Sequence, residues 1–219
     1  MPASRCEHLV ESAAELFYRD GFNATGIDKI LRDAGVAKMT LYRHFCSKDD
    51  LILAALRRKD ERFRNWLVRT VEGSANDPRQ RLLAVFDALE QWFSAPDFHG
   101  CMFINAAAEF GDLADPVHAA AAEHKRLVRN YLETLAVAAG AKKPRQLAQQ
   151  INLLVDGAVV TAHVSGDPSV AKTARAAAEV LIEAALDRVE GEAPSGGSSL
   201  MKPPRGSAQT RESALRQKS

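Results

Sequence analysis

Residues 25–48, TGIDKILRDAGVAKMTLYRHFCSK, constrain the fold most, because they predict two short helices joined by a tight turn. Thr25 and Asp28 have the spacing of a capping box, which predicts that the first helix begins at this threonine. Gly35 predicts its end, since glycine readily adopts the left-handed conformation found at helix C-termini. Between them, apolar residues at spacings of three and four predict one buried face: Ile27, Ile30 and Leu31.

The second helix, about residues 38–45, combines a short apolar side with a polar one. Leu41 and Phe45, four residues apart, predict the buried side. The other side chains would point outward or flank the helix: Lys38, Met39, Thr40, Tyr42, Arg43 and His44. Such side chains can neutralise phosphates, hydrogen-bond to phosphates or base edges and contact thymine methyl groups. The pattern alone fits a DNA-reading helix and an ordinary helical hairpin with a solvated face equally well.

Residues 9–56 resemble the N-terminal DNA-binding domain of the TetR family of transcriptional repressors. The matching segments are AAELFYRDGFNATGI, ILRDAGVAKMTLYRHF and SKDDL, and together they span nearly fifty residues without a gap. Cys46 departs from the family pattern, in which proline, glycine or another small turn residue is more usual. The resemblance implies a helix-turn-helix domain followed by a helical domain that binds an effector and forms a dimer.

The resemblance also implies which side chains of this segment contact DNA: Thr25, Lys38, Met39, Thr40, Tyr42, Arg43, His44 and Lys48. Those that open the second helix would approach base edges. Tyr42 and His44 match the family's phosphate contacts, and Arg43 fits either role. Thr25 and Lys48 match backbone anchors at helix N-termini, where the helix dipole adds attraction for phosphate.

The remaining chain predicts an all-α fold of about nine helices. Alanine is abundant, and no segment alternates at period two over the length of a strand. Capping residues and Asp-Pro or Lys-Pro pairs mark the starts of most helices. The predicted helices cover residues 4–20, 26–34, 38–45, 48–71, 78–95, 101–111, 116–139, 144–165 and 168–190.

Three parts are expected along the sequence. Residues 1–47 would form the helix-turn-helix domain, and residues 48–190 the ligand-binding and dimerisation domain. Residues 191–219 are rich in Ser, Gly, Pro and Arg, and we expect a flexible tail, since few large apolar side chains offset the entropy of ordering it. That tail could add weak nonspecific DNA affinity or be an inert extension.

An effector pocket in the middle of the chain is implied by the resemblance. Such pockets are mostly apolar and contain a few placed polar groups. The candidate lining residues are Trp66, Trp92, Phe103, Asn105, Phe110, His124, Leu127, Tyr131, Asp156 and His163. Each of them also fits an ordinary core or surface position.

The last two helices have broad apolar stripes that could serve both a core and a partner. The expected dimer contacts are Ile151, Leu154, Val155, Ala158, Ala174, Ala178, Leu181 and Ile182. The resemblance implies that this helix pair forms a four-helix bundle with a second copy. The alternative is that both stripes belong to the core of one chain.

Neither a metal site nor a catalytic motif is recognisable. The histidines and cysteines lack metal-ligand spacing, and the nucleophile elbow, the HExxH motif and phosphate-binding glycine loops are absent from the sequence. The three cysteines, Cys6, Cys46 and Cys101, are far apart and form no disulfide pattern, which indicates a reducing cytoplasm. We expect Cys101 to serve helix packing rather than redox sensing. No apolar run approaches the length of a membrane span.

The sequence therefore predicts a cytoplasmic DNA-binding regulator that is neither an enzyme nor a cofactor-binding protein. We expect a homodimeric repressor that binds a palindromic operator and is released by a small-molecule effector. Two alternatives remain open. One is an activator of the same fold, and the other is a helical small-molecule-binding protein or enzyme without a specific DNA target.

Overall fold

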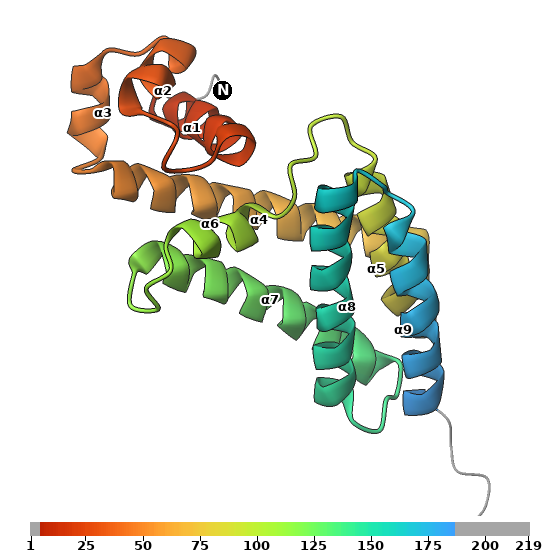
Figure 1. The fold of residues 1–219 in the computed structure, drawn as a ribbon. Coiled ribbons are helices and arrows are strands. Elements are labelled where there is room, and N and C mark those ends of the chain that lie inside the picture. Colours follow the sequence, from red (N-terminus) through yellow and green to blue (C-terminus); the bar gives the residue numbers. More distant parts are fainter. Residues whose placement is uncertain (1–4, 187–219) are drawn as a thin grey trace, which may run out of the picture. The chain divides into compact units, whose positions relative to one another are not determined.

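The computed structural model describes residues 5–186, and within this range the chain folds into nine α-helices without a β-strand. They are α1 (Arg5–Asp20), α2 (Ile27–Ala34), α3 (Lys38–His44), α4 (Lys48–Ser74), α5 (Pro78–Phe93), α6 (Met102–Glu109), α7 (Pro116–Ala138), α8 (Pro144–Ser165) and α9 (Val170–Leu186) (Figure 1). The all-α prediction is confirmed. Ser4 and the expected tail from residue 191 onward lie outside the described residues.

Helices α1–α3 form a compact head at one end of α4 (Figure 1). The rings of Phe17 and Phe22 stack with centroids 5.3 Å apart at its centre. Leu9, Ile30 and Leu41 are fully buried in the same apolar cluster. Because Leu41 packs inward from the short helix α3, the opposite side of that helix faces solvent.

Gly35 ends α2 as predicted. Its φ of 61° lies in the left-handed region, and its N–H donates to the carbonyl of Arg32. The next amide, that of Val36, donates to Leu31, so the last turn of α2 is closed before α3 begins. This turn fixes the angle between the two helices of the motif.

Thr25 does not cap α2, so the prediction of a capping box with Asp28 is wrong. The N-cap is Gly26, which offers no side-chain hydrogen bond. The side chain of Thr25 is fully buried, and its hydroxyl donates to the carbonyl of Gly21 at 2.7 Å. A buried hydroxyl needs an acceptor, and the C-terminal end of α1 provides unpaired carbonyls. The expected contact of this side chain with DNA is therefore also excluded by the fold.

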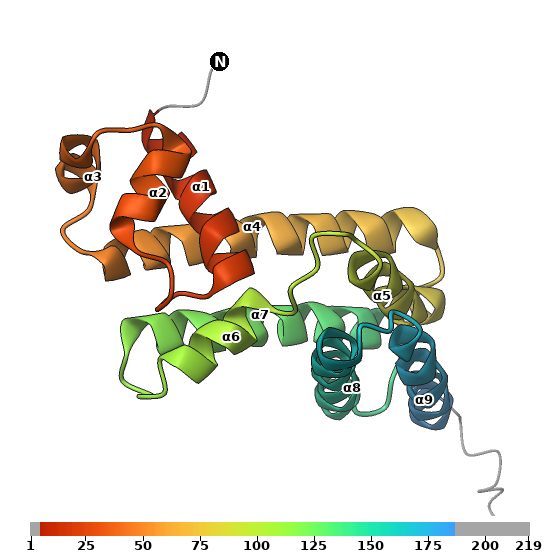
Figure 2. The same ribbon diagram turned by 45° about the horizontal axis from the view of Figure 1, so that its top comes forward.

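α4 begins with the predicted capping box. The Asp50 N–H donates to Ser47 Oγ at 3.1 Å, and the Ser47 N–H donates to Asp50 Oδ2 at 3.0 Å. The helix runs for 27 residues, about 40 Å, and ends three residues later than the expected residue 71. Figure 2 shows α4 extending from beneath the head into the rest of the described chain, where α7 packs along it.

Helices α5–α9 form the body, with α8 and α9 side by side (Figure 1). Asp77 and Asp115 cap α5 and α7, each before a proline in the first turn, as predicted. α8 has the predicted bounds, whereas α9 begins at Val170 instead of residue 168. Here Asp167 accepts a hydrogen bond from the Ser169 N–H at 2.8 Å, which holds a turn in place of the first helical residues.

Thr25→Val tests the buried hydroxyl. It keeps the shape of the side chain but leaves the carbonyl of Gly21 without its donor, so the free energy of unfolding should fall by about 1–3 kcal/mol. Urea titration at one fixed protein concentration measures it. The control is Thr134→Val, since the hydroxyl of Thr134 bonds to Asn130 on the exposed side of α7, and it should change stability by less than about 0.5 kcal/mol. Equal effects of the two substitutions would contradict this role.

Candidate nucleic-acid interface and effector cavity

The outer side of α3 carries the side chains expected to contact DNA. Lys38, Arg43 and His44 are exposed and Thr40 is half-buried. Two larger side chains also project into solvent: Met39 is 72% exposed and Tyr42 is 52% exposed. A face of this composition, about two helical turns long, can enter a major groove.

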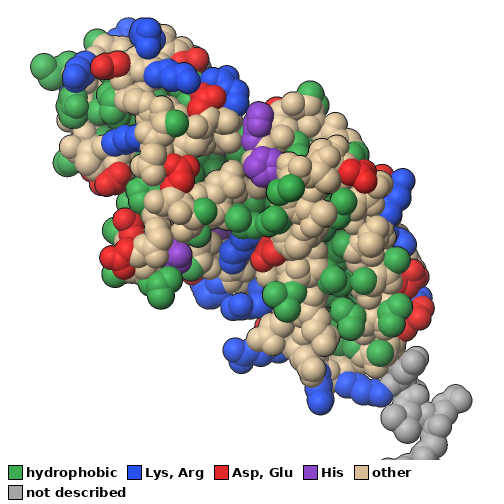
Figure 3. All heavy atoms as spheres, viewed as in Figure 1, with side chains coloured by type: hydrophobic (Ala, Val, Ile, Leu, Met, Phe, Trp, Pro, Cys, Tyr) green, Lys and Arg blue, Asp and Glu red, His purple; other side chains and the backbone are tan. Residues whose placement is uncertain are grey.

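The cations of this face are available to a polyanion. Within the described residues, Lys38 and Arg43 form no ion pair, and α3 contains no acidic side chain. Lys48 lies half-buried in the first turn of α4. By contrast, Lys29 of α2 is paired with Asp20 at 2.9 Å. The space-filling view shows Lys and Arg side chains over the head (Figure 3). Contact of these residues with DNA stays a prediction.

Two sets of hydrogen bonds fasten the head to the body. Glu109, the last residue of α6, accepts from the N–H groups of Phe22 at 2.9 Å and Asn23 at 2.7 Å. The hydroxyl of Tyr18 on α1 donates to the carbonyl of Gly100 at 3.0 Å and accepts from the His99 N–H at 2.9 Å. Burial raises the pKa of Tyr18, so its hydroxyl stays protonated as this donor requires.

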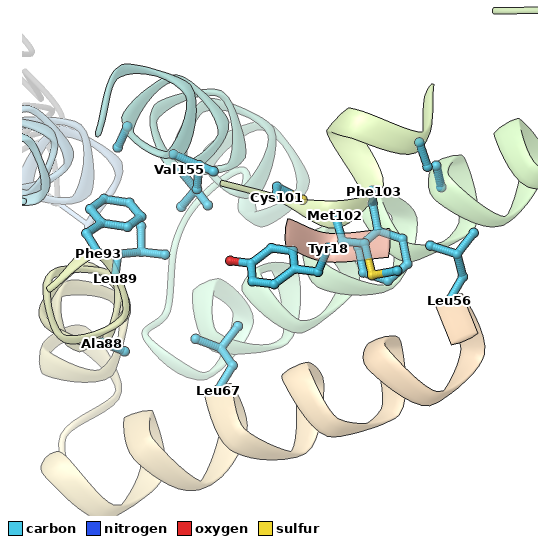
Figure 4. Packing of buried hydrophobic residues seen from close by; sticks show 14 of the residues in the cluster. Tyr18, Leu56, Leu67, Ala88, Leu89, Phe93, Cys101, Met102, Phe103 and Val155 are labelled. Carbon is cyan, nitrogen blue, oxygen red and sulfur yellow. The ribbon is translucent and has the colours of Figure 1, made fainter. Parts of the chain in front are cut away.

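The ring of Tyr18 also enters the packed interior. Figure 4 shows it among core residues of three other helices, including Leu67 of α4, Phe93 of α5 and Phe103 of α6. A head residue is therefore part of the core of the body. The two parts are joined by packing as well as by the hydrogen bonds of Tyr18 and Glu109.

A cavity of about 510 Å³ lies beside this junction. Its walls come from α1, from α4 and from the segment between residues 92 and 99. Of the ten residues proposed for an effector pocket, Trp66 and Trp92 line it. The sequence could not place it, because most of its lining comes from charged and aromatic positions of α1 and α4 that read as a helix surface.

The other pocket candidates occupy different places. Phe110 packs edge-on against Phe22 of the head, and the exposed His163 lies against Gly100. Asp156 accepts from Lys125 at 2.7 Å. Asn105, Leu127 and Tyr131 are half-buried, and burial raises the pKa of Tyr131 to about 12. None of these lines the cavity beside α1.

His124 of α7 forms a polar link to α4 and stacks on Phe103 of α6. The two rings stack with centroids 3.6 Å apart, and His124 Nδ1 lies 2.7 Å from Asp60 Oδ1. Burial lowers the pKa of His124, so the neutral ring donates this hydrogen bond. Burial opposes ionisation of Asp60, but hydrogen bonds from His124 and Arg64 outweigh it and lower the pKa of Asp60 to about 2. The charged carboxylate is thus held between the two helices.

Most of the predicted dimer contacts pack into the core of the single chain, and their contact with a partner stays a prediction. Six of the eight are buried within the protomer: Ile151, Val155, Ala158, Ala174, Ala178 and Ile182. Leu154 and Leu181 are half-buried and pack against the same core. The physical reason is that α8 and α9 are apolar on two sides, and the inward side takes these residues.

The outward side of the pair carries apolar residues that the sequence did not single out. Leu153 is 72%, Val160 45%, Val164 83% and Val180 65% exposed. The three on α8 follow at spacings of seven and four and so form one stripe. Figure 3 shows hydrophobic side chains on the face formed by α8 and α9.

Two family models match this chain. One is described as bacterial regulatory proteins, tetR family, and matches residues 9–55. The other is described as tetracyclin repressor-like, C-terminal domain, and matches residues 78–178. The crystal structure of a TetR-family transcriptional regulator from Streptomyces coelicolor is 32% identical in sequence, has a TM-score of 0.78, and aligns over 85% of this chain and 92% of that one. The chain belongs to the TetR family of transcriptional regulators.

Two curated relatives of this TetR-family chain match over shorter stretches. The transcriptional repressor NemR of Escherichia coli is 28% identical over 115 residues, which is 52% of this chain and 58% of that protein. The transcriptional activator FasR of Mycolicibacterium smegmatis is 41% identical over 80 residues, 36% of each. The chain thus spans little more than half the length of the first of these relatives. One of these two relatives is named a repressor and the other an activator.

Three further observations concern the described part of this TetR-family chain. No helix there is both long and apolar enough to cross a membrane. No group of three or more metal-ligating side chains comes together there. Cys101 is buried, Cys6 is half-buried and Cys46 is exposed on the head, and all three are free thiols.

Proposed function

We propose that this TetR-family chain is a cytoplasmic transcriptional repressor that binds a palindromic operator as a homodimer and leaves it when an effector binds. The observation that carries the proposal is the exposed face of α3, where Lys38 and Arg43 have no ion-pair partner within the described residues. An unpaired cation on a short, outward helix gains most from a phosphate, because no existing contact is lost.

On this proposal the head divides its contacts into two kinds. Lys38, Met39 and Thr40 at the start of α3 read base edges. Tyr42, Arg43, His44 and Lys48 bind phosphates and fix the register of the head on the duplex. Lys48 does so at the N-terminus of a 27-residue helix, where the dipole favours an anion. The boundaries at residues 47 and 190 remain predictions, and α4 links the two functional parts.

Two heads are needed, because one short helix reads few base pairs and helix-turn-helix proteins usually bind as two-fold dimers. We place the dimer contact on the outward stripe of α8 and α9, which includes Leu153, Val160, Val164 and Val180. A contiguous exposed apolar patch is uncommon on a monomer. A self-complementary pairing of this patch would give the isologous contact of a two-fold dimer.

Repression is favoured over activation by the relative NemR, whose stretch of similarity is longer than that of FasR. A bound dimer that covers a promoter blocks polymerase, whereas one bound beside it can recruit polymerase. The position of the operator therefore decides the sign. In vitro transcription from the bound promoter separates the two: less transcript on addition of protein supports repression, and more transcript supports activation.

Tyr42→Ala and Lys38→Ala test the DNA contacts. On a fragment recovered by genomic selection, Tyr42→Ala should weaken binding about tenfold through loss of a hydrogen bond to a charged phosphate. Lys38→Ala should weaken it too and lower the slope of log affinity against log salt by about one. Fluorescence anisotropy at several salt concentrations measures both.

The control is Lys142→Ala, an exposed lysine at the far end of the body, which should leave affinity and salt slope unchanged. Wild-type affinity in both head variants would contradict the interface. Failure of the wild-type protein to retain any fragment, together with turnover of a metabolite, would favour the alternative of a helical enzyme without a specific DNA target.

Leu153→Glu tests the dimer face. A two-fold contact would bring two carboxylates into an apolar interface, so the variant should sediment as a monomer where the wild type is a dimer. The matched control is Val137→Glu, which places the same charge at a 59% exposed valine of α7 and should leave the dimer intact. A wild-type monomer, or a dimeric Leu153→Glu, would contradict this assignment.

A further inference from the structure

The cavity beside α1 has an aromatic side. Phe63 and Trp66 project from α4, with ring centroids 5.6 Å apart, and Trp92 lies 5.0 Å from Phe63. Tyr18 of α1 lines the same space. The rings are tilted by 47° and 59° against Phe63, so they form an apolar wall against which an aromatic ligand can pack. The volume of about 510 Å³ falls within the range of small-molecule sites.

All but one of the cations that line the cavity have an ion-pair partner. Glu11 is paired with both Arg58 and Arg62, and Arg19 is paired with Asp20. Lys59 is the exception among the lining cations, because it forms no ion pair within the described residues. Its ammonium lies 4.3 Å above the ring centroid of Tyr18, and burial lowers the pKa of Lys59.

Two lining carboxylates, Glu15 and Asp97, also have no ion-pair partner within the described chain, but both are exposed. The charge of Asp97 raises the pKa of Lys59, but burial outweighs it, and water and salt screen both exposed carboxylates. Lys59 is half-buried against rings that cannot neutralise it. A partly desolvated cation without an ion-pair partner gains most from an incoming anionic group.

We propose that this cavity binds an amphipathic organic anion, with a planar apolar body against Phe63, Trp66 and Trp92 and its carboxylate, sulfonate or phosphate at Lys59. Ligand binding in the cavity does not depend on the proposed function; only the expected effect of the ligand on DNA binding rests on it. Lys59 is the specificity-determining residue, and the aromatic side chains supply the contact area.

The walls of the cavity explain how such a ligand would act on the head. Tyr18 belongs to α1, whereas Lys59 and Trp66 belong to α4. Tyr18 and His99 both line the cavity and are joined by one of the hydrogen bonds that hold the head. A ligand in the cavity would contact both α1 and α4 and so change the seating of α1. It releases DNA to the extent that it binds the DNA-free arrangement more tightly.

The test uses a property of the whole sequence. Trp66 and Trp92 are its only two tryptophans, and both line the cavity, so intrinsic tryptophan fluorescence reports on this site. The probes are anilinonaphthalene sulfonate and phenylnaphthylamine, which has the same rings without the sulfonate. The sulfonate should quench tryptophan emission with an affinity about tenfold above that of the neutral probe, and only the sulfonate should weaken as salt is raised.

Lys59→Met keeps the stem of the side chain and removes its charge. It should lower the affinity for the sulfonate about tenfold and leave that for phenylnaphthylamine unchanged. Lys142→Met, the same change at an exposed lysine outside the cavity, should alter neither. Equal binding of both probes to the wild type, absence of salt dependence, or unchanged sulfonate affinity in Lys59→Met would overturn the proposal. The first two measurements need no variant, so they hold even if Lys59→Met folds poorly.

Probe binding requires no DNA, so the site and the proposed function fail separately. If the selected fragment is bound specifically but the probes do not discriminate, only the anion site is wrong. If the probes discriminate but no fragment is retained, the cavity is an anion site and the regulatory proposal is wrong. If both hold, saturating sulfonate should lower affinity for the fragment at least about fivefold in the wild type and not in Lys59→Met.

Discussion

The seating of the first helix on the body is the constraint on which the rest of the structure depends. Glu109 accepts two backbone N–H groups in the turn after α1, at 2.9 and 2.7 Å. Bonds to a carboxylate are stronger than neutral ones, and these N–H groups have left the helix and need acceptors. Gly21 has a φ of 88°, and a Cβ there would lie 3.1 Å from Glu109 Oε1. The turn therefore suits glycine both in conformation and in space.

The direction of the proposed DNA-binding face follows from this seating. α2 and α3 are attached to α1 through a small core, with Phe17, Phe22 and Leu41 at its centre. The head therefore moves as a unit, and the direction of the α3 face is set where α1 meets the body. The cavity shares Tyr18 with that contact. A ligand in this cavity, as we propose, would therefore act where the head is seated on the body.

Local rules predicted much of the fold, because helix ends depend on few residues. Ser47, Asp77 and Asp115 cap helices where the sequence placed them, and Gly35 ends α2. Thr25 shows the limit of these rules, since the same hydroxyl that could cap a helix is instead buried against the end of α1. Whether this hydroxyl meets a backbone N–H of α2 or the carbonyl of Gly21 depends on packing that a spacing pattern does not contain.

The surfaces were harder to predict, because they depend on which side of a helix faces inward. Leu153 and Leu154 are neighbours in an apolar helix, yet the first is exposed and the second packs against the core. The apolar stripes of α8 and α9 were predicted, but the residues on their inward side were expected to contact a second copy of the chain. Only Trp66 and Trp92 of the cavity lining were predicted, for a related reason. Its walls join Tyr18 and Lys59, distant in sequence, and Lys59 reads as an ordinary solvated residue of a long helix.

The spacing of the two heads in the proposed dimer tests this account most directly. Cys46 is exposed on the head, and its N–H is fixed by Asp50, so a spin label there, in a Cys6→Ser background, reports head position. The account predicts one narrow distance between the two labels in the wild type. The distribution should broaden in Glu109→Ala but not in Glu72→Ala, a change at an exposed glutamate of α4. An unchanged distribution in Glu109→Ala, or no distance between protomers at all, would contradict it.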